Sequence, residues 1–162
     1  MASGDGNGWV YCTCGGQHWG LHGAAGLLLT DGTHVLLAHR AAWTHQGGSW
    51  AVPGGALDSD ESPVQAALRE MGEETSLDPS GLTPFDEWVD EHGPWRYTTV
   101  LARVDGRPDI TPDHHENDGV RWWRLDEVTG LQLHGGFAAA WPSLRDRITR
   151  AAPPIGPDAP LP

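Results

Sequence analysis

The sequence predicts an α/β protein, either an α/β/α sandwich around a mixed sheet or an α+β domain. Two observations lead to this expectation: apolar segments separated by turns rich in Gly, Pro and Asp indicate strands, and two segments have helical character. The strands and helices do not alternate regularly, which favours a mixed sheet. With 162 residues, the chain has the length of one domain.

The strands are predicted from short apolar segments bounded by turn residues. They are expected over residues 23–30, 35–39, 50–53, 82–90, 95–104 and 120–125. Asp31-Gly32 is a strong hairpin signal between the first two strands. His92-Gly93-Pro94 is expected to join the strands 82–90 and 95–104 as an antiparallel pair. Within the last strand, Trp122 and Trp123 should point to opposite faces of the sheet.

The most strongly predicted helix runs from Pro63 to Thr75. Ser62 is suited to cap it, Pro63 is favoured at the first helical position, and Gln65 completes a capping box. A second helix is predicted over residues 137–150, with Pro142 in its early part.

The domain organisation follows from composition. Residues 1–20 are Gly-rich and polar and are expected to form a flexible lead-in, residues 21–150 the folded domain, and residues 151–162 a disordered Pro-rich tail. No run of about 18 apolar residues indicates a membrane span. The first 30 residues contain no Lys or Arg, so no secretory signal is visible. We therefore expect a cytoplasmic protein that does not enter a membrane.

The charge balance is strongly acidic and limits the partners. The chain has 22 Asp and Glu residues against 10 Lys and Arg, a formal net charge of −12 at pH 7. Such a protein should repel duplex nucleic acid and anionic membranes. If it acts on phosphates, it should do so through a divalent metal ion.

Three glutamates gather on one side of the helix 63–75. At 100° per residue, Glu70, Glu73 and Glu74 share an arc of about 100° that lies roughly 130° from the apolar stripe. Only Arg69 in this helix can offset their repulsion. A solvated acidic face would explain the pattern. However, the Gly54-Gly55 turn precedes the helix, and hard divalent cations prefer such oxygen ligands, so we favour a metal site for a phosphate substrate.

The same segment resembles the Nudix box. Gly55, Glu61 and the run Arg69-Glu70-Met71-Gly72-Glu73-Glu74-Thr75-Ser76-Leu77 match its constrained positions, except that Ser76 replaces a family glycine. That glycine ends the helix, so a strained or reshaped helix end is expected here. Residues 50–55 are also similar to the entry strand of MutT-like members, and residues 116–127 to their penultimate loop and late strand. The resemblance implies the Nudix-type α/β/α sandwich with a mixed sheet.

The resemblance implies hydrolysis of a nucleoside diphosphate linked to another moiety, with Mg²⁺ or Mn²⁺ as cofactor. It places metal ligands at Gly54 (through its carbonyl), Glu70, Glu73, Glu74 and Glu116. Arg69 would pair with Glu61 or Glu73, and this pairing would fix the orientation of Glu70. The general base is left open between Glu70, which is favoured, and Glu116. The catalytic set is therefore Arg69, Glu70, Glu73 and Glu116.

The substrate is less well determined. Nine tryptophans are present, and the candidate substrate-binding residues are Arg40, Trp43, Trp95 and Trp122. The Trp-x-x-Pro-Gly-Gly entry favours nucleoside triphosphates, including oxidised purine nucleotides. Pro94 weakly resembles the ADP-ribose signature, which leaves an ADP-ribose or nucleotide-sugar pyrophosphatase as an alternative. A nucleotide-sensing module without catalysis is a further alternative, although such modules tend to lose these glutamates. A homodimer is left open, because many relatives are dimers.

The N-terminal segment contains a second set of metal-binding residue types. Cys12, Cys14, His18 and His22 could together hold Zn²⁺. Structural zinc sites usually have two to four residues between their cysteines, whereas one residue separates these two. The favoured interpretation is therefore a pair of free thiols in a flexible arm.

Overall fold

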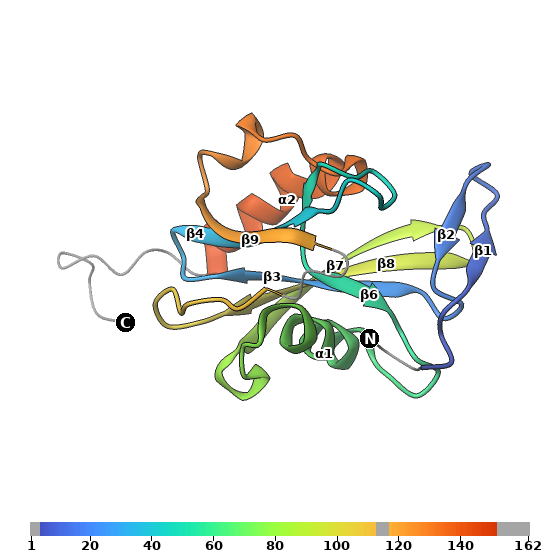
Figure 1. Ribbon diagram of the computed structural model, residues 1–162, viewed down its shortest axis with the longest axis horizontal. Coiled ribbons are helices and arrows are strands. Elements are labelled where there is room, and N and C mark those ends of the chain that lie inside the picture. The colour runs from blue at the N-terminus through green and yellow to red at the C-terminus, as the bar shows by residue number, and fades with distance from the viewer. Residues whose placement is uncertain (1–3, 113–116, 152–162) are drawn as a thin grey trace.

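The molecule is a three-layer α/β/α sandwich. The computed structural model describes residues 4–112 and 117–151. Within these residues, seven strands form a mixed sheet, and one helix packs against each of its faces (Figure 1). The α/β/α prediction is confirmed. No helix in the described part of the chain has the length and apolar character needed to cross a membrane.

A strand lies close to each of the six predicted segments, and three further strands, at residues 9–11, 17–19 and 54–56, were not predicted. Gly54-Gly55, expected as a turn, belongs to the last of these. The strands are β1 (Trp9–Tyr11), β2 (Gln17–Trp19), β3 (Ala24–Thr30), β4 (His34–Arg40), β5 (Trp50–Ala51), β6 (Gly54–Ala56), β7 (Thr83–His92), β8 (Trp95–Arg103) and β9 (Asn117–Arg124). The helices are α1 (Pro63–Thr75) and α2 (Gly135–Ala151), with short 3-10 turns at Pro79–Gly81 and Val128–Gly130. The main sheet has the order β5-β4-β3-β8-β7, with β6 paired to β3 and β9 paired to β4. The β3–β8 pair is parallel and the other pairs are antiparallel.

The central strand β3 contributes to both cores. Leu27 and Leu29 pack on the side of α1, whereas Leu28 packs on the side of α2, as the alternation of a strand requires. Every residue of β3 is buried. On β9, Trp122 joins the α1 side and Trp123 the α2 side, which confirms that these neighbours point to opposite faces.

Helix α1 begins and ends as its sequence predicts. Ser62 accepts a hydrogen bond from the Gln65 N–H, and the Gln65 side chain accepts one from the Ser62 N–H, so the capping box is complete. At the other end, Ser76 adopts the left-handed conformation, with φ 61° and ψ 14°. Its N–H donates to the Gly72 carbonyl at 3.0 Å. The strained helix end expected from the serine is therefore present.

Replacing Ser76 by glycine is expected to stabilise the protein by about 0.5–1 kcal/mol, because glycine adopts positive φ without a steric cost. Urea unfolding of the two proteins measures the difference. Ser76→Ala is the matched control: alanine keeps the Cβ and therefore the strain, so it should give no gain. Equal stabilities for the glycine and alanine variants would contradict the prediction.

The N-terminal segment forms a hairpin where composition predicts loose order. Strands β1 and β2 pair antiparallel from Trp9↔Trp19 to Tyr11↔Gln17 and form a separate two-stranded sheet. The rings of Trp9 and Trp19 contact edge to face, with centroids 5.1 Å apart. These strands were not predicted because each has only three residues and the surrounding segment is Gly-rich. The predicted tail, residues 151–162, lies outside the described residues except for Ala151, the last residue of α2.

His134 caps the start of α2. Its carbonyl accepts the Ala138 N–H at 2.8 Å, and its Nδ1 accepts the Gly136 N–H at 3.3 Å. Burial, together with the nearby positive charges of Arg40 and His45, lowers the pKa of His134 to about 4. The ring is therefore neutral in the folded protein at pH values where an unfolded histidine is charged.

This difference predicts a loss of stability as the pH falls from about 6.5 towards 4, because the unfolded chain then binds a proton that the folded chain does not. His134→Asn keeps a capping acceptor but cannot titrate in this range. We expect the drop in unfolding free energy between pH 7 and pH 5 to be about 1–2 kcal/mol smaller in this variant. Denaturant unfolding at both pH values provides the measurement, and identical drops would contradict the assignment.

Candidate functional site

The predicted carboxylates lie where α1 passes β6. Glu70 and Glu74 are 9% and 8% exposed, and they are the two buried acidic residues of the described chain. Acidic side chains are rarely so buried unless charged or polar groups compensate them. Their neighbours on α1, Ala66, Ala67 and Met71, are fully buried against β3 and β8, so the helix face is fixed.

Arg69 ties the loop before α1 to the helix. Its Nε and Nη2 donate to the two carboxylate oxygens of Glu61 at 2.7 and 2.8 Å, a bidentate ion pair. Its Nη1 donates to Glu70 Oε1 at 3.0 Å and lies 3.5 Å from Glu73 Oε1. The remaining contact is from Nη2 to the Ala56 carbonyl at 3.1 Å. Arg69 thus contacts both of its expected partners and holds Glu70 directly.

Glu61 holds the Arg69 guanidinium in position beside α1. The hydrogen bonds from Arg69 lower the pKa of its carboxyl group, and the Asp58 N–H adds a further hydrogen bond at 3.0 Å. Glu61 therefore remains ionised at neutral pH and directs the guanidinium towards α1.

Two glycines of β6 allow the strand to approach its neighbours closely. A Cβ at Gly55 would lie 2.4 Å from Glu70 Oε1, and a Cβ at Gly54 would lie 2.4 Å from the Ala25 carbonyl. Real Cβ atoms essentially never come this close, so a side chain at Gly55 would displace the Glu70 carboxylate. The backbone of β6 and the acidic face of α1 are therefore in direct contact.

Two further residues border the carboxylates and were not predicted as members of the site. Asn117, 4% exposed at the start of β9, donates from Nδ2 to Glu74 Oε1 at 3.3 Å. Tyr97 of β8 has a raised pKa, first because of burial and then because of the negative charge of Glu74. Both come from strands distant in sequence from α1, and no local pattern could have placed them there.

The other predicted residues fall in different surroundings. Arg40 ends β4 and donates from Nε to the His45 carbonyl at 2.8 Å, while Trp43 is 74% exposed in the loop that follows. Trp95 is 9% exposed and stacks on His18, with centroids 4.3 Å apart. Trp122 packs on the α1 core, and its Nε1 donates to the Pro108 carbonyl at 3.3 Å. Glu116 lies outside the described residues.

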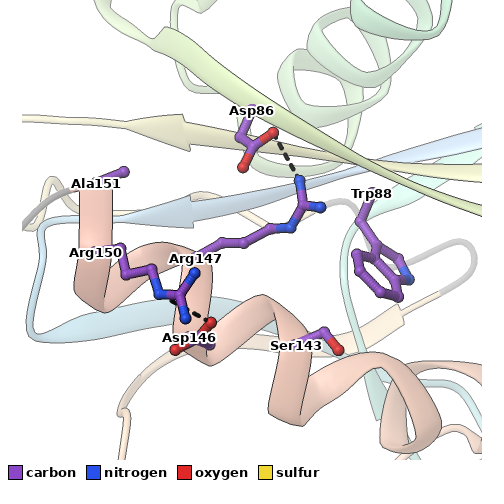
Figure 2. A pocket seen from close by; sticks show the side chains of 7 residues that line it. All are labelled: Asp86, Trp88, Ser143, Asp146, Arg147, Arg150 and Ala151. Atoms are coloured by element: carbon purple, nitrogen blue, oxygen red, sulfur yellow. Dashed lines mark hydrogen bonds and ion pairs between the residues drawn. The ribbon is translucent and has the colours of Figure 1, made fainter.

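Two cavities of the described structure lie away from the buried glutamates of α1. A cavity of about 450 Å³ lies between β7 and α2, and its charged side chains pair with each other, Arg147 with Asp86 at 2.8 Å and Arg150 with Asp146 at 3.2 Å (Figure 2). Another, of about 390 Å³, is lined by residues such as His34 and Arg145. Neither includes a residue of α1 or β6. Buried charge is therefore the feature that identifies the candidate site.

Comparison with known proteins agrees with this geometry. The family model described as the NUDIX domain matches residues 20–146, which include β6, α1 and the start of β9. The chain belongs to the Nudix hydrolase family. This Nudix chain is 47% identical over 155 residues to the putative 8-oxo-dGTP diphosphatase 3 of Mycobacterium tuberculosis, a match covering 88% of this chain and 70% of that protein.

A second Nudix relative is much longer. The chain is 37% identical over 156 residues to a nucleoside triphosphate pyrophosphatase/Nudix hydrolase fusion protein of Bifidobacterium longum. The match covers 91% of this chain and 32% of that protein, so the chain spans about a third of this relative.

Two solved structures have the same fold. The crystal structure of RenU, a Nudix hydrolase from M. smegmatis, matches with a TM-score of 0.85 and 43% identity over 93% of this chain and 99% of that one. A bifunctional NMN adenylyltransferase/ADP ribose pyrophosphatase of Francisella tularensis, complexed with AMP and a Mn ion, matches with a TM-score of 0.67 over 77% of this chain and 41% of that one. At 23% identity, the latter likeness concerns the fold alone.

Proposed function

We propose that this Nudix hydrolase cleaves the pyrophosphate linkage of nucleoside triphosphates, with oxidised purine nucleotides among its substrates, and that it requires Mg²⁺ or Mn²⁺. The observation that carries the proposal is the burial of Glu70 and Glu74 beside β6. The M. tuberculosis relative named as putative 8-oxo-dGTP diphosphatase 3 supports the choice of substrate class.

The charge of the cluster supports a cation requirement. Among the described residues, Arg69 contacts three carboxylates, those of Glu61, Glu70 and Glu73, and Glu74 lies one helical turn from Glu70. The cluster thus gathers four acids on and beside α1, and a pyrophosphate would add further negative charge. Carboxylate oxygens are the ligands that Mg²⁺ and Mn²⁺ prefer, so the donor set fits such an ion.

The residues that would hold the cations are Gly54 (through its carbonyl), Glu70, Glu73 and Glu74. When bound, divalent cations neutralise the phosphates and lower the pKa of water. Arg69 keeps the Glu70 carboxylate oriented, and Asn117 does the same for Glu74 through its 3.3 Å hydrogen bond. We assign Glu70 as the general base that removes the proton from the attacking water, with Glu116 as the alternative.

Substrate contacts are proposed for Arg40 and Trp43. Trp43 is exposed and available to stack on a base. Arg40 lowers the pKa of Tyr97 against the raising effects of burial and Glu74, which supports a role for its positive charge near the carboxylates. Trp95 and Trp122 are engaged in packing, and we do not assign them to the substrate.

A substrate screen tests the proposal. The full chain is incubated with nucleoside triphosphates, 8-oxo-dGTP, ADP-ribose, nucleotide sugars and dinucleoside polyphosphates, each with Mg²⁺, Mn²⁺ or EDTA, and the products are quantified. The expected result is metal-dependent release of pyrophosphate or phosphate from triphosphates. Preferential cleavage of ADP-ribose or nucleotide sugars, or nucleotide binding without turnover, would contradict the proposal.

Melting temperature provides an independent check. Millimolar Mg²⁺ or Mn²⁺ should raise the melting temperature, because an ion that binds only the folded chain stabilises it. The rise should be smaller in Glu74→Gln. If neither cation changes the melting temperature of the unaltered protein, the proposed metal site is wrong.

A further inference from the structure

The tip of the β1–β2 hairpin faces the turn between β7 and β8. Cys12 and Cys14 lie in the tip, His18 is on β2, and His92 ends β7. One ligand atom from each of these four residues lies within 4.8 Å of the others. We propose that Cys12, Cys14, His18 and His92 bind a zinc ion, separate from the carboxylate site on α1.

The hairpin turn holds the two cysteines together despite the single residue between them. The Cys12 N–H donates to the Gly16 carbonyl at 3.0 Å, and the Gly15 N–H donates to the Cys12 carbonyl at 3.1 Å. The turn is tight because Gly15 has a φ of +90°. Within it, the Cys14 N–H points to Cys12 Sγ at 3.2 Å. The backbone, rather than the sequence spacing, therefore brings both sulfurs to one side.

The β7–β8 turn completes the group from the other side. A Cβ at Gly93 would lie 2.8 Å from Thr13 Oγ1 and 3.9 Å from Cys12 Sγ, so the two turns are in contact. Cys12 Sγ donates to the His92 carbonyl at 3.1 Å across 80 residues of sequence. In the thiol form of Cys12 this bond holds His92 beside the hairpin tip, and a zinc ion would replace the thiol proton and join the two side chains directly.

The spacing of the ligand atoms fits a tetrahedral ion. With Zn–S near 2.3 Å and Zn–N near 2.0–2.1 Å, the edges of a tetrahedral site are about 3.3–3.8 Å long. Cys14 Sγ and His18 Nε2 are 3.3 Å apart, close to such an edge. The ligand atoms of the whole group lie within 4.8 Å of one another, about 1 Å more than such an edge, so the side chains would draw together around an ion.

Both imidazoles are oriented by neighbours. Asp90 Oδ2 lies 3.2 Å from Nε2 of His92, and a carboxylate on one ring nitrogen fixes a histidine so that its other nitrogen can bind a metal. The His18 ring stacks nearly parallel on Trp95, at an interplanar angle of 10°. Ring orientation is therefore established before an ion arrives.

The donor set selects zinc rather than magnesium. Thiolate and imidazole ligands favour Zn²⁺, whereas Mg²⁺ prefers oxygen. Four protein ligands leave no open position, which is typical of structural zinc sites. The ion would fasten the N-terminal hairpin to the β7–β8 turn.

Sequence spacing led to a different grouping. His22 was the fourth candidate ligand, but its Nε2 lies 4.0 Å from Asp5 Oδ1 and it is not part of the group. His92 is the fourth member of the group instead. It was not predicted as a partner of the cysteines because it lies about 80 residues away in the sequence.

Metal analysis of the full chain tests the proposal. The protein is purified under reducing conditions without chelator, freed of any affinity tag, and its zinc content is measured by mass spectrometry. Close to one zinc ion per chain is expected. Replacing zinc with Co²⁺ should produce the charge-transfer absorption of thiolate–cobalt bonds, which a carboxylate site cannot give.

Variants then identify the ligands. Cys14 is exposed, so Cys14→Ser should fold while its zinc affinity falls by at least about 100-fold. Asp90→Asn, which keeps all four ligands, should lose about 10- to 100-fold. His22→Ala and Glu74→Gln are the matched controls and should bind zinc as the unaltered protein does.

Three results would overturn the proposal. The first is a reduced protein that contains no zinc and shows no cobalt charge-transfer absorption. The second is unchanged zinc affinity in Cys14→Ser. The third is a Cys12–Cys14 disulfide as the stable form in the presence of zinc and reductant, detected as a mass lower by two hydrogens.

Discussion

Glu70→Gln and Glu74→Gln are each expected to reduce turnover by at least about 100-fold while the fold survives. Glutamine keeps the size of the side chain but removes the negative charge that we propose holds a divalent cation. Folding should survive because each substitution relieves repulsion within the cluster, and Asn117 can still donate to an amide oxygen at position 74. Steady-state kinetics at saturating Mg²⁺ and circular dichroism provide the two measurements.

Glu87→Gln is the matched control for these variants. Glu87 is an exposed acid of β7, and its replacement removes the same charge outside the cluster. Its kinetics should equal those of the unaltered protein. Full activity of either α1 variant would remove that glutamate from the ligand set.

Arg69→Met is expected to lower the free energy of unfolding by about 2–4 kcal/mol, measured by urea denaturation in EDTA. Methionine keeps much of the aliphatic stem, so the loss reports on the guanidinium. That group makes four hydrogen bonds to Glu61, Glu70 and the Ala56 carbonyl, and its removal leaves these partly buried acids without their cation.

Arg124→Met provides the comparison. Arg124 also pairs with a carboxylate at 2.7 Å, that of Asp126, but the two side chains are 62% and 57% exposed. Solvent and salt screen such a pair, so its loss should change stability by less than about 1 kcal/mol. Equal losses for the two variants would show that Arg69 has no special structural role.

Local sequence patterns predicted the elements that depend on neighbouring residues. The capping box of Ser62 and Gln65 and the opposite faces of Trp122 and Trp123 follow from spacing within one segment. The strained helix end at Ser76 follows from the resemblance to the Nudix box. The contacts of Arg69 are also local, because Glu61 lies in the loop immediately before α1 and Glu73 lies one turn further along the same helix.

Contacts between distant segments could not be predicted in this way. Asn117 reaches Glu74 only because β9 pairs with β4 beside β3. His92 reaches Cys12 only because the β7–β8 turn meets the N-terminal hairpin. Trp95 is an aromatic residue of the kind that stacks on bases, yet its ring stacks on His18. Each outcome depends on strand order, which a single sequence does not reveal.

The fixed ends of α1 have a consequence for the speed of ligand exchange. Hydrogen-bonded caps hold both ends of this helix, and its inner face is fully buried. Translation of α1 along its axis, or rotation about it, would break these contacts. The glutamates can therefore move only by rotation about their side-chain bonds. Such rotations take place in picoseconds to nanoseconds. We therefore expect cations to enter and leave without any rearrangement of the main chain, and hydrogen exchange of the α1 amides to be slow already without Mg²⁺.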